Sequence, residues 1–212
     1  RLGTIGGVMV VGIENKDNRT RDLTPSASAA GRQGRLDPSA SPQGGGAGRF
    51  LDFITGELRQ TVEAQLPDGM RILRRTLIGH SFGGLFTVNA VLTQPHAFDD
   101  FIAADPSFWW DQRRLIQKAA ADGLGDKAAA GSGRRLYLGF ATKPRKDRTA
   151  SAERPAAGAR LSADPLVSGF IGKLQSQGLQ VRRQDFPDEV HGTVMFPALF
   201  DALKHFYTRE LS

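Results

Sequence analysis

The residues with the clearest chemical pattern are Gly79-His80-Ser81-Phe82-Gly83-Gly84, which lie between a strand-like apolar run and a helix-like run. A serine hydroxyl is a weak nucleophile unless a base activates it, and a Gly-x-Ser-x-Gly sequence permits the tight strand-to-helix turn that presents such a serine. At a helix start, free backbone amides can stabilise an oxyanion, and the amide of Phe82 is the first such donor. The pattern predicts Ser81 as the nucleophile of an acyl-transfer reaction.

A nucleophilic serine needs a base, and the chain contains four histidines. His191 stands in a loop between the last predicted strand and the last predicted helix, which is where hydrolases with this turn carry their base. His80 lies inside the turn itself, and we expect it to point away from the site and to pack or hydrogen-bond locally. His96 follows a proline in a loop, and His205 falls between the apolar positions of a helix. We therefore predict His191 as the base.

The acid that would orient His191 is not determined by the pattern. In the usual chain order it follows the strand at 136–140, but residues 141–146 contain no carboxylate. Asp105 ends the preceding strand and could orient His191 from an adjacent strand end. The alternatives are a Ser–His dyad without an acid, or one of three other carboxylates: Asp147, Glu153 and Glu189.

Strand-like and helix-like segments alternate around these residues. Short apolar runs predict strands buried in a sheet at residues 8–13, 76–79, 101–104 and 136–140, and residues 179–186 are predicted to supply the last strand. Apolar residues three or four apart predict helices at 50–66, 82–92, around 115, 165–177 and 199–207. Asp164 before Pro165 is a typical helix start, with a capping side chain followed by proline. The alternation predicts an α/β fold with a mostly parallel sheet and helices on both faces.

Composition narrows the possible classes of site. The 212 residues include no cysteine, which excludes disulfides, thiolate metal sites and cysteine nucleophiles. The hydrophobic fraction is 40%, and no apolar run reaches the roughly 20 residues that a membrane span needs. The formal charge of +6 comes from basic residues spread along the chain, so we expect a solvated surface and no nucleic-acid partner. Serine chemistry of this kind needs no metal or organic cofactor.

The length suits one domain covering residues 1–212. Within it, residues 25–48 are rich in Ser, Ala, Gly and Pro and lack apolar periodicity, which predicts a mobile loop. The chain opens without the pattern of a signal peptide and runs straight into a strand-like segment, so we expect an internal start. Both a cytoplasmic and a periplasmic or secreted location stay open, as does the oligomeric state.

Several segments together resemble the Putative esterase family, which includes esterase D-like enzymes and the hydrolases of ferric enterobactin and salmochelin. The segments occur in the family's order over almost the whole chain: Gly12–Asn15, Arg19–Pro25, Gly44–Phe53, Gly79–Gly84, Asp105–Asp111 and His191–Val194. The resemblance implies an α/β-hydrolase fold with Ser81 as nucleophile and His191 as base. It is specific for the family and unspecific for the substrate.

The same resemblance implies a substrate mouth formed by the loop at 19–25 and the segment at 108–110. Arg21 could engage a substrate anion there or form an ion pair with Asp22. Trp109 and Trp110 could line an acyl or aromatic pocket or serve as plain packing. Relatives commonly carry an acid after the strand at 136–140, which is missing here, although dyad members exist. Relatives also begin earlier, with strands whose Asp-Gly pair supplies a second oxyanion amide, so the resemblance implies an N-terminally truncated domain with an exposed sheet edge.

The function predicted from the sequence is a serine esterase that cleaves a small-molecule ester through an acyl-serine intermediate. Two alternatives accompany it. The missing acid and second oxyanion donor favour a weak or inactive hydrolase-fold binding module, and the same chemistry with a different acceptor would make an acyltransferase.

Overall fold

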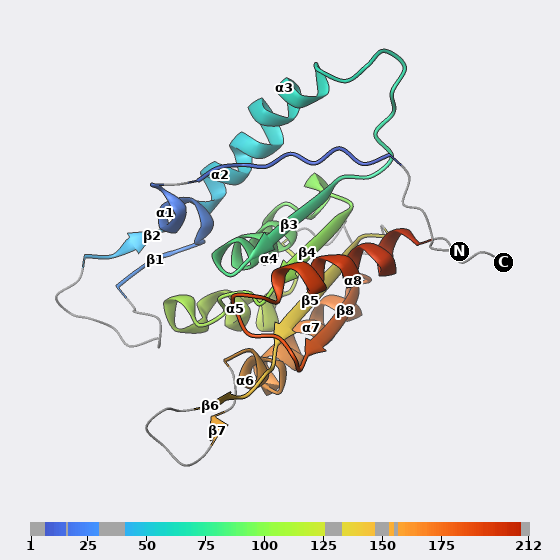
Figure 1. Cartoon of the computed structure of the whole chain (residues 1–212). Helices are drawn as coiled ribbons and strands as arrows, with labels where there is room; N and C mark the ends of the chain where they lie inside the picture. Colours follow the sequence, from blue (N-terminus) through green and yellow to red (C-terminus); the bar gives the residue numbers. More distant parts are fainter. Residues whose placement is uncertain are drawn as a thin grey trace.

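The computed structural model describes residues 7–15, 17–29, 41–125, 133–146, 153–154 and 157–208. Its central element is a four-stranded sheet of order β3-β4-β5-β8 in which every neighbouring pair is parallel (Figure 1). The four strands are β3 (Thr76–His80), β4 (Asp100–Ala104), β5 (Arg135–Ala141) and β8 (Gln180–Phe186). These strands and their direction confirm the sequence prediction for this part of the sheet.

Helices cover both faces of the sheet (Figure 1). The long ones are α4 (Phe82–Thr93), α5 (Arg114–Asp122), α7 (Pro165–Ser176) and α8 (Met195–Tyr207). The shorter helical pieces are α1 (Arg19–Leu23), the 3-10 turns η2 (Pro95–Ala97) and η3 (Trp110–Arg113), and α6 (Ala157–Ser162). Asp164 accepts a hydrogen bond from the amide of Leu166 at 2.8 Å, so the predicted cap of α7 is confirmed. None of the described helices is long and apolar enough to cross a bilayer.

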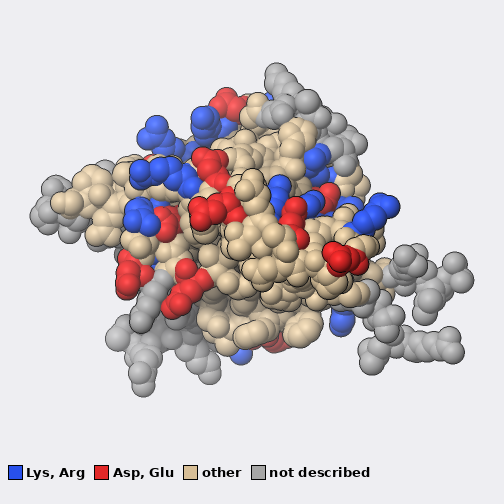
Figure 2. Space-filling view, turned by 90° about the horizontal axis from the view of Figure 1, so that it is seen from above, with Lys and Arg blue, Asp and Glu red and all other residues tan. Residues whose placement is uncertain are grey.

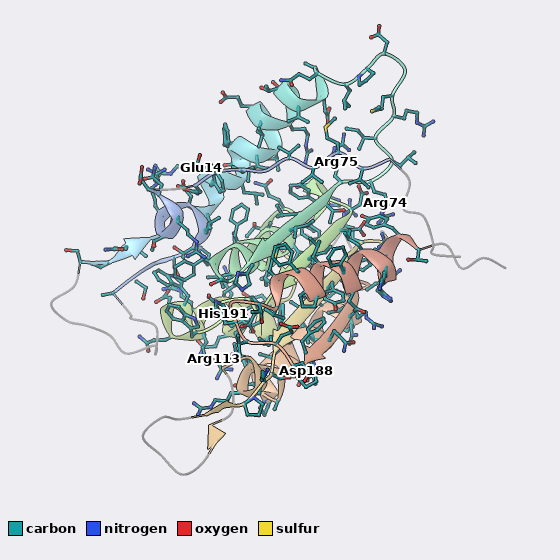
Figure 3. All side chains as sticks on the ribbon, viewed as in Figure 1. Glu14, Arg74, Arg75, Arg113, Asp188 and His191 are labelled. Atoms are coloured by element: carbon teal, nitrogen blue, oxygen red, sulfur yellow. The ribbon has the colours of Figure 1, made fainter. Side chains whose placement is uncertain are left out.

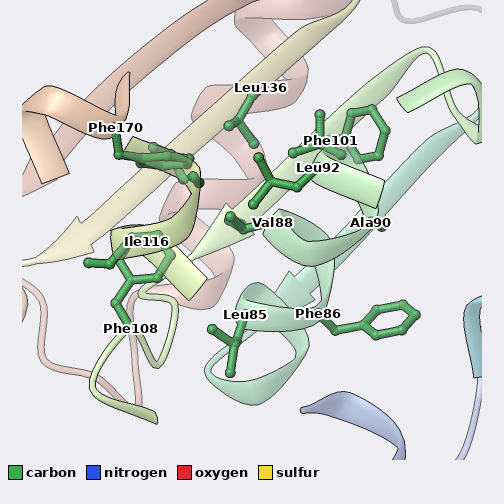
Figure 4. Close-up of a cluster of buried hydrophobic side chains, with 14 of the residues drawn as sticks. Leu85, Phe86, Val88, Ala90, Leu92, Phe101, Phe108, Ile116, Leu136 and Phe170 are labelled. Carbon is green, nitrogen blue, oxygen red and sulfur yellow. The ribbon is translucent and has the colours of Figure 1, made fainter. Parts of the chain in front are cut away.

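The alternation of side chains along β4 divides the core between the two faces of the sheet. Phe101 and Ala103 join the larger cluster, which packs against α4, α5 and α7, and part of which is seen in Figure 4. Ile102 and Ala104 point to the opposite face and pack against α8. A strand buried on both faces has to be apolar throughout, which is why β4 is a continuous apolar run after its first residue. The single-domain organisation stays a prediction.

The helix expected at 50–66 is built from three consecutive pieces, α2 (Ala47–Phe53), the π-helical turn η1 (Ile54–Leu58) and α3 (Arg59–Glu63). Its apolar residues recur every four positions, which is more than the 3.6 residues of an α-helical turn. In a regular α-helix this stripe would rotate away from the core. A π turn is wider, so it brings the stripe back and leaves Ile54 buried.

The strand predicted at 8–13 is wrong. These residues have no regular secondary structure, and their side chains are exposed, with Val10 at 86%. In Figure 1 the segment runs outside the sheet, and in the described part of the chain no strand pairs with it. A strand needs a neighbour for its N–H and C=O groups, and apolar β-branched residues alone do not supply one.

The loop predicted at 25–48 is partly ordered at its ends. Ser28 and Gln43 belong to β1 (Ala27–Ser28) and β2 (Gln43–Gly44), which pair antiparallel. The centre, residues 30–40, lies outside the described residues. A second short pair joins β6 (Arg145–Lys146) to β7 (Glu153–Arg154).

Charged side chains of both signs lie among one another on the face seen in Figure 2. Several basic residues form ion pairs, including Arg75 with Glu63 and, within β8, Arg183 with Asp185. The described part of the face in Figure 2 therefore presents mixed charge and no continuous basic stripe.

Candidate active site

Ser81 occupies the turn between β3 and α4 in a backbone conformation that L-residues rarely adopt, with φ 60° and ψ −117°. Such a conformation costs on the order of 1–3 kcal/mol and persists only where the surroundings hold it. Here the amide of Ser81 donates to the carbonyl of Ala104 at 3.0 Å, and the carbonyl of Ser81 accepts from the amides of Leu85 and Ser107 at 3.0 and 3.1 Å. The turn is therefore fixed to the end of β4 and to the first turn of α4.

The two glycines of the motif have different roles in this turn. A Cβ at Gly79 would lie 2.1 Å from the carbonyl oxygen of Gly83, so a side chain cannot fit there. A Cβ at Gly83 would meet no atom within 4 Å. Only the first glycine is required by the close approach of β3 and α4.

Ser81, His191 and Asp105 form a continuous hydrogen-bonded chain. Ser81 Oγ lies 3.1 Å from His191 Nε2, and His191 Nδ1 lies 2.6 Å from Asp105 Oδ2. A carboxylate only accepts hydrogen bonds, so the imidazole proton is on Nδ1 and Nε2 is free to accept the proton of Ser81. The arrangement can therefore activate the serine hydroxyl in the manner of a Ser–His–Asp triad.

Asp105 is the carboxylate that reaches His191, and it comes from the end of β4. It is only 6% exposed, whereas the side chain of His191 is 52% exposed. Its second oxygen accepts from the amide of Ala141 at 3.3 Å, and a Cβ at Gly158 would lie 2.7 Å from that same oxygen. Asp105 is thus enclosed between β5 and α6, while the ring of His191 faces the solvent.

The other carboxylates considered from the sequence do not reach His191 in the described structure. Glu189 accepts a hydrogen bond from Thr193 Oγ1 at 2.5 Å, within its own loop. The side chain of Glu153 and the whole of Asp147 lie outside the described residues.

The amide of Phe82 is the first in α4, and it donates to no acceptor among the described residues. An unpaired amide at a helix start, next to the nucleophile, is suited to stabilise an oxyanion. The hydroxyl of Ser107 also lies near the nucleophile, 3.3 Å from Ser81 Oγ. Ser107 stands two residues after Asp105, in a segment whose sequence pattern gives it no predicted role.

The arginine beside the site is Arg19 rather than Arg21. Arg21 forms a bidentate ion pair with Asp22 at 2.6 and 3.0 Å, which is the second of its two expected roles. The guanidinium carbon of Arg19 lies 4.9 Å from the centre of the Phe82 ring. No carboxylate in the described part of the chain forms an ion pair with Arg19.

The two tryptophans pack with Phe82. The ring centroid of Phe82 lies 5.7 Å from Trp109 and 5.2 Å from Trp110. Trp110 is buried, and its indole N–H donates to the carbonyl of Ser26 at 2.9 Å, so it anchors the segment that leads to β1. Trp109 is only partly buried, which leaves it the better placed of the two to touch a substrate.

His80 does not point away from the site, contrary to the prediction. Its Nε2 lies 2.7 Å from the carbonyl oxygen of His191, and the two rings are 4.6 Å apart. Alternation along β3 explains this direction, because Thr76, Ile78 and His80 face the side of α8 and of the loop before it. His96 lies in η2 and His205 in α8, away from Ser81.

Two open hollows, each of about 420 Å³, lie beside α1. The first is lined by residues 17–21, Gln43 and Gly44. The second is lined by Arg21, Asp22, Arg49, Phe50 and Phe53. Neither includes Ser81 or His191. The candidate catalytic residues are therefore identified by the hydrogen bonds among Ser81, His191 and Asp105, and not by these hollows.

Comparison with known proteins relates this chain to a set of hydrolases. The family model described as Putative esterase matches residues 1–162. The siderophore enterobactin esterase of Emericella nidulans is 33% identical over 193 residues, which is 85% of this chain and 63% of that protein.

Two solved structures are similar over most of this chain. The siderophore hydrolase EstA from Aspergillus nidulans has a TM-score of 0.67 and 29% identity over 89% of this chain and 65% of its own. The IroE-like serine hydrolase from Shewanella oneidensis has a TM-score of 0.64 and 28% identity over 91% of this chain and 57% of its own. Their likeness supports the α/β-hydrolase fold. The chain spans less than two thirds of the length of each of these three proteins.

Proposed function

Because the chain belongs to the Putative esterase family, we propose that it is a serine hydrolase that cleaves carboxylic esters through an acyl-serine intermediate. The observation that carries the proposal is the chain of hydrogen bonds from Ser81 through His191 to Asp105, with distances of 3.1 and 2.6 Å. A buried carboxylate, an imidazole in a defined tautomer and a serine in a strained turn are the parts that acyl transfer needs.

The reaction proceeds in two halves. His191 Nε2 accepts the hydroxyl proton while Ser81 Oγ attacks the ester carbonyl, and the amide of Phe82 donates to the resulting oxyanion. His191 then gives the proton to the departing alcohol, which leaves the acyl group on Ser81. In the second half His191 takes a proton from water, the hydroxide attacks the acyl carbon, and Ser81 recovers its proton as the acid departs. Asp105 keeps the imidazole oriented and stabilises its cation in both halves.

The names of the relatives indicate which esters to test first. They are described as a siderophore enterobactin esterase and a siderophore hydrolase, so we propose a siderophore-type ester as the substrate. Phe82 and Trp109 offer aromatic surface beside the nucleophile, and Arg19 adds a cation over Phe82. This combination suits a substrate with aromatic and anionic groups.

The test uses a fluorophosphonate probe, which reacts rapidly only with an activated serine. We expect fast labelling of the whole chain, and we expect Ser81→Ala to abolish both labelling and hydrolysis of p-nitrophenyl acetate and of enterobactin. Ser168→Ala is the matched control, because Ser168 is an exposed serine on α7. Full activity of Ser81→Ala would overturn the proposal, as would a wild-type chain that neither labels nor hydrolyses any of these esters.

A further inference from the structure

His80 connects the nucleophile's strand directly to the loop that carries the base. It is the last residue of β3 and the direct neighbour of Ser81. Its ring Nε2 lies 2.7 Å from the backbone carbonyl oxygen of His191, 111 positions away in the sequence. A carbonyl oxygen can only accept, so Nε2 of His80 carries the proton and donates it.

In the loop between β8 and α8, this bond holds the backbone at His191. Other parts of the loop have their own hydrogen bonds, such as those from Lys143 to the carbonyl of Glu189 and from Thr193 to the carbonyl of Val190. Among the described residues, the backbone of His191 makes one hydrogen bond, and it is the one from His80. Its side chain is half exposed, so packing alone does not restrain it. The donor on β3 therefore holds the backbone of His191 close to Ser81, while Asp105 holds its side chain.

The two imidazole rings also lie close together, with centroids 4.6 Å apart and planes inclined by 37°. The charged and titratable groups that face His80 are His191 itself, Asp105 behind it and Arg19 from α1. Burial lowers the pKa of His80, and the neighbouring His191 lowers it further, which together outweigh the hydrogen bond to the carbonyl of His191. His80 is thus neutral at neutral pH, and its single N–H is the one that Nε2 donates to the carbonyl of His191.

We propose that His80 is a positioning residue for the base: its N–H holds the backbone of His191 and so keeps the imidazole of that residue beside Ser81. The inference rests on the proposed esterase function. It adds that the residue before the nucleophile acts on the base and not on the substrate.

The test separates the N–H donor from the ring. In His80→Gln the side-chain amide places an N–H close to the position of Nε2, whereas in His80→Asn it stops near the position of Nδ1. His80→Phe keeps an aromatic ring and removes the donor. Because a base displaced by about 1 Å slows the chemical step by up to about 100-fold, we expect kcat to fall about 10- to 100-fold in His80→Asn and His80→Phe with KM unchanged. We expect His80→Gln to stay within about threefold of wild type, because the backbone bond is restored.

Each variant is assayed by fluorophosphonate labelling and by hydrolysis of p-nitrophenyl acetate, at a temperature at which circular dichroism finds it folded. His205→Gln is the matched control, since His205 lies on the exposed side of α8, and we expect it to behave as wild type. Wild-type rates in His80→Phe and His80→Asn would overturn the inference, and so would equal losses in the Gln and Asn variants. Failure of the wild-type chain itself to label would instead count against the esterase function.

Discussion

Strand β4 is flanked by two buried aspartates with different partners. Asp100 begins the strand, is 0% exposed, and accepts two hydrogen bonds each from the guanidinium groups of Arg74 and Arg135, at distances between 2.6 and 2.9 Å. Asp105 follows the strand, is 6% exposed, and pairs with His191 at 2.6 Å. Figure 3 places Arg74 and His191 at opposite ends of the sheet.

The difference between the two ends lies in when the partner is charged. Arg74 and Arg135 are cations at every ordinary pH, so their attraction to Asp100 is present in the resting protein and contributes to folding. His191 becomes a cation only when it takes a proton, so in the proposed reaction its full attraction to Asp105 arises only once Ser81 has given up its proton. The same type of side chain therefore stabilises the fold at one end of β4 and, in the proposed reaction, the transition state at the other.

The substitution with the largest expected effect on activity is Asp105→Asn. The amide retains the size of the carboxylate, but it can donate to His191 Nδ1 and so favours the wrong tautomer of the imidazole. We expect kcat for p-nitrophenyl acetate to fall by about 10⁴-fold, as a comparable substitution does in a Ser–His–Asp triad, while the urea midpoint changes little. Asp122→Asn, on the exposed face of α5, is the control. A loss of less than tenfold would mean that Ser81 and His191 work as a dyad.

The reciprocal substitution is Asp100→Asn. It leaves the partly buried guanidinium group of Arg135 and the exposed one of Arg74 without their shared buried carboxylate, and breaking a buried ion pair costs up to about 3–5 kcal/mol. We expect the free energy of unfolding by urea to fall by up to this amount. In the protein that stays folded, we expect fluorophosphonate to label Ser81 at nearly the wild-type rate. Strong loss of labelling without loss of stability would contradict the division between the two ends.

The pH dependence of stability gives a second measure of the Asp100 end. Burial raises the pKa of Asp100, but hydrogen bonds from Arg135, Arg74 and Tyr207 lower it more, so the pKa is below its ordinary value. A carboxyl group whose pKa is lower in the folded state stabilises the fold above the unfolded value of about 3.9, and this stabilisation disappears as the pH falls through the folded value. We therefore expect urea unfolding to report a loss of stability below about pH 4 in wild type and a smaller loss in Asp100→Asn. Identical acid profiles would contradict this assignment.

At the Asp105 end, the two glycines of the nucleophile turn provide a matched pair. Gly79→Ala would place a methyl group 2.1 Å from the carbonyl oxygen of Gly83, and overpacking of this kind costs about 1–3 kcal/mol. Because the strain falls on the turn that holds Ser81, we expect slower fluorophosphonate labelling as well as lower stability. Gly83→Ala adds a methyl group in open space and is expected to fold normally. Equal effects of the two substitutions would show that the close approach at Gly79 is relieved by movement of the turn.

The sequence predicted the parts of the fold that depend on local pattern. The strands at 76–79 and 101–104 are confirmed because apolar runs between polar segments have to be buried in a sheet. The apolar segment at 8–13 has the same composition and is not a strand, because pairing depends on which other strand lies beside it. That information is not contained in the segment itself.

For the site, spacing identified Ser81 and His191 as candidates but not their surroundings. Asp105 was one of several possible acids, since its approach to His191 depends on β4, β5 and β8 lying parallel, which brings the residues after β4 and β8 to the same edge of the sheet. His80 was misjudged because its direction follows from the alternation of β3 and from the position of a loop 111 residues later. Arg19 and Arg21 are two residues apart, and only packing of α1 against α4 distinguishes the one beside Phe82.

The smallest expected effect comes from Tyr207, the third partner of Asp100. Its hydroxyl donates to Asp100 and lies 2.5 Å from Thr76 Oγ1, and burial together with the bond to Asp100 raises the pKa of the phenol. The hydroxyl therefore stays protonated as a donor at neutral pH. Tyr207→Phe keeps the ring, which lies 5.3 Å from the guanidinium carbon of Arg135, and removes only the hydroxyl.

We expect Tyr207→Phe to lower the free energy of unfolding by about 1–2 kcal/mol, in the range of a hydrogen bond to a charged group, and to leave labelling of Ser81 unchanged. The sharper measurement is the double variant with Asp100→Asn. If the hydroxyl acts through the carboxylate, its removal costs less once the charge is gone, and the two losses are not additive. Strict additivity would mean that Tyr207 stabilises α8 through Thr76 instead, and that the charged group at this end of β4 consists of Asp100 and its two arginines alone.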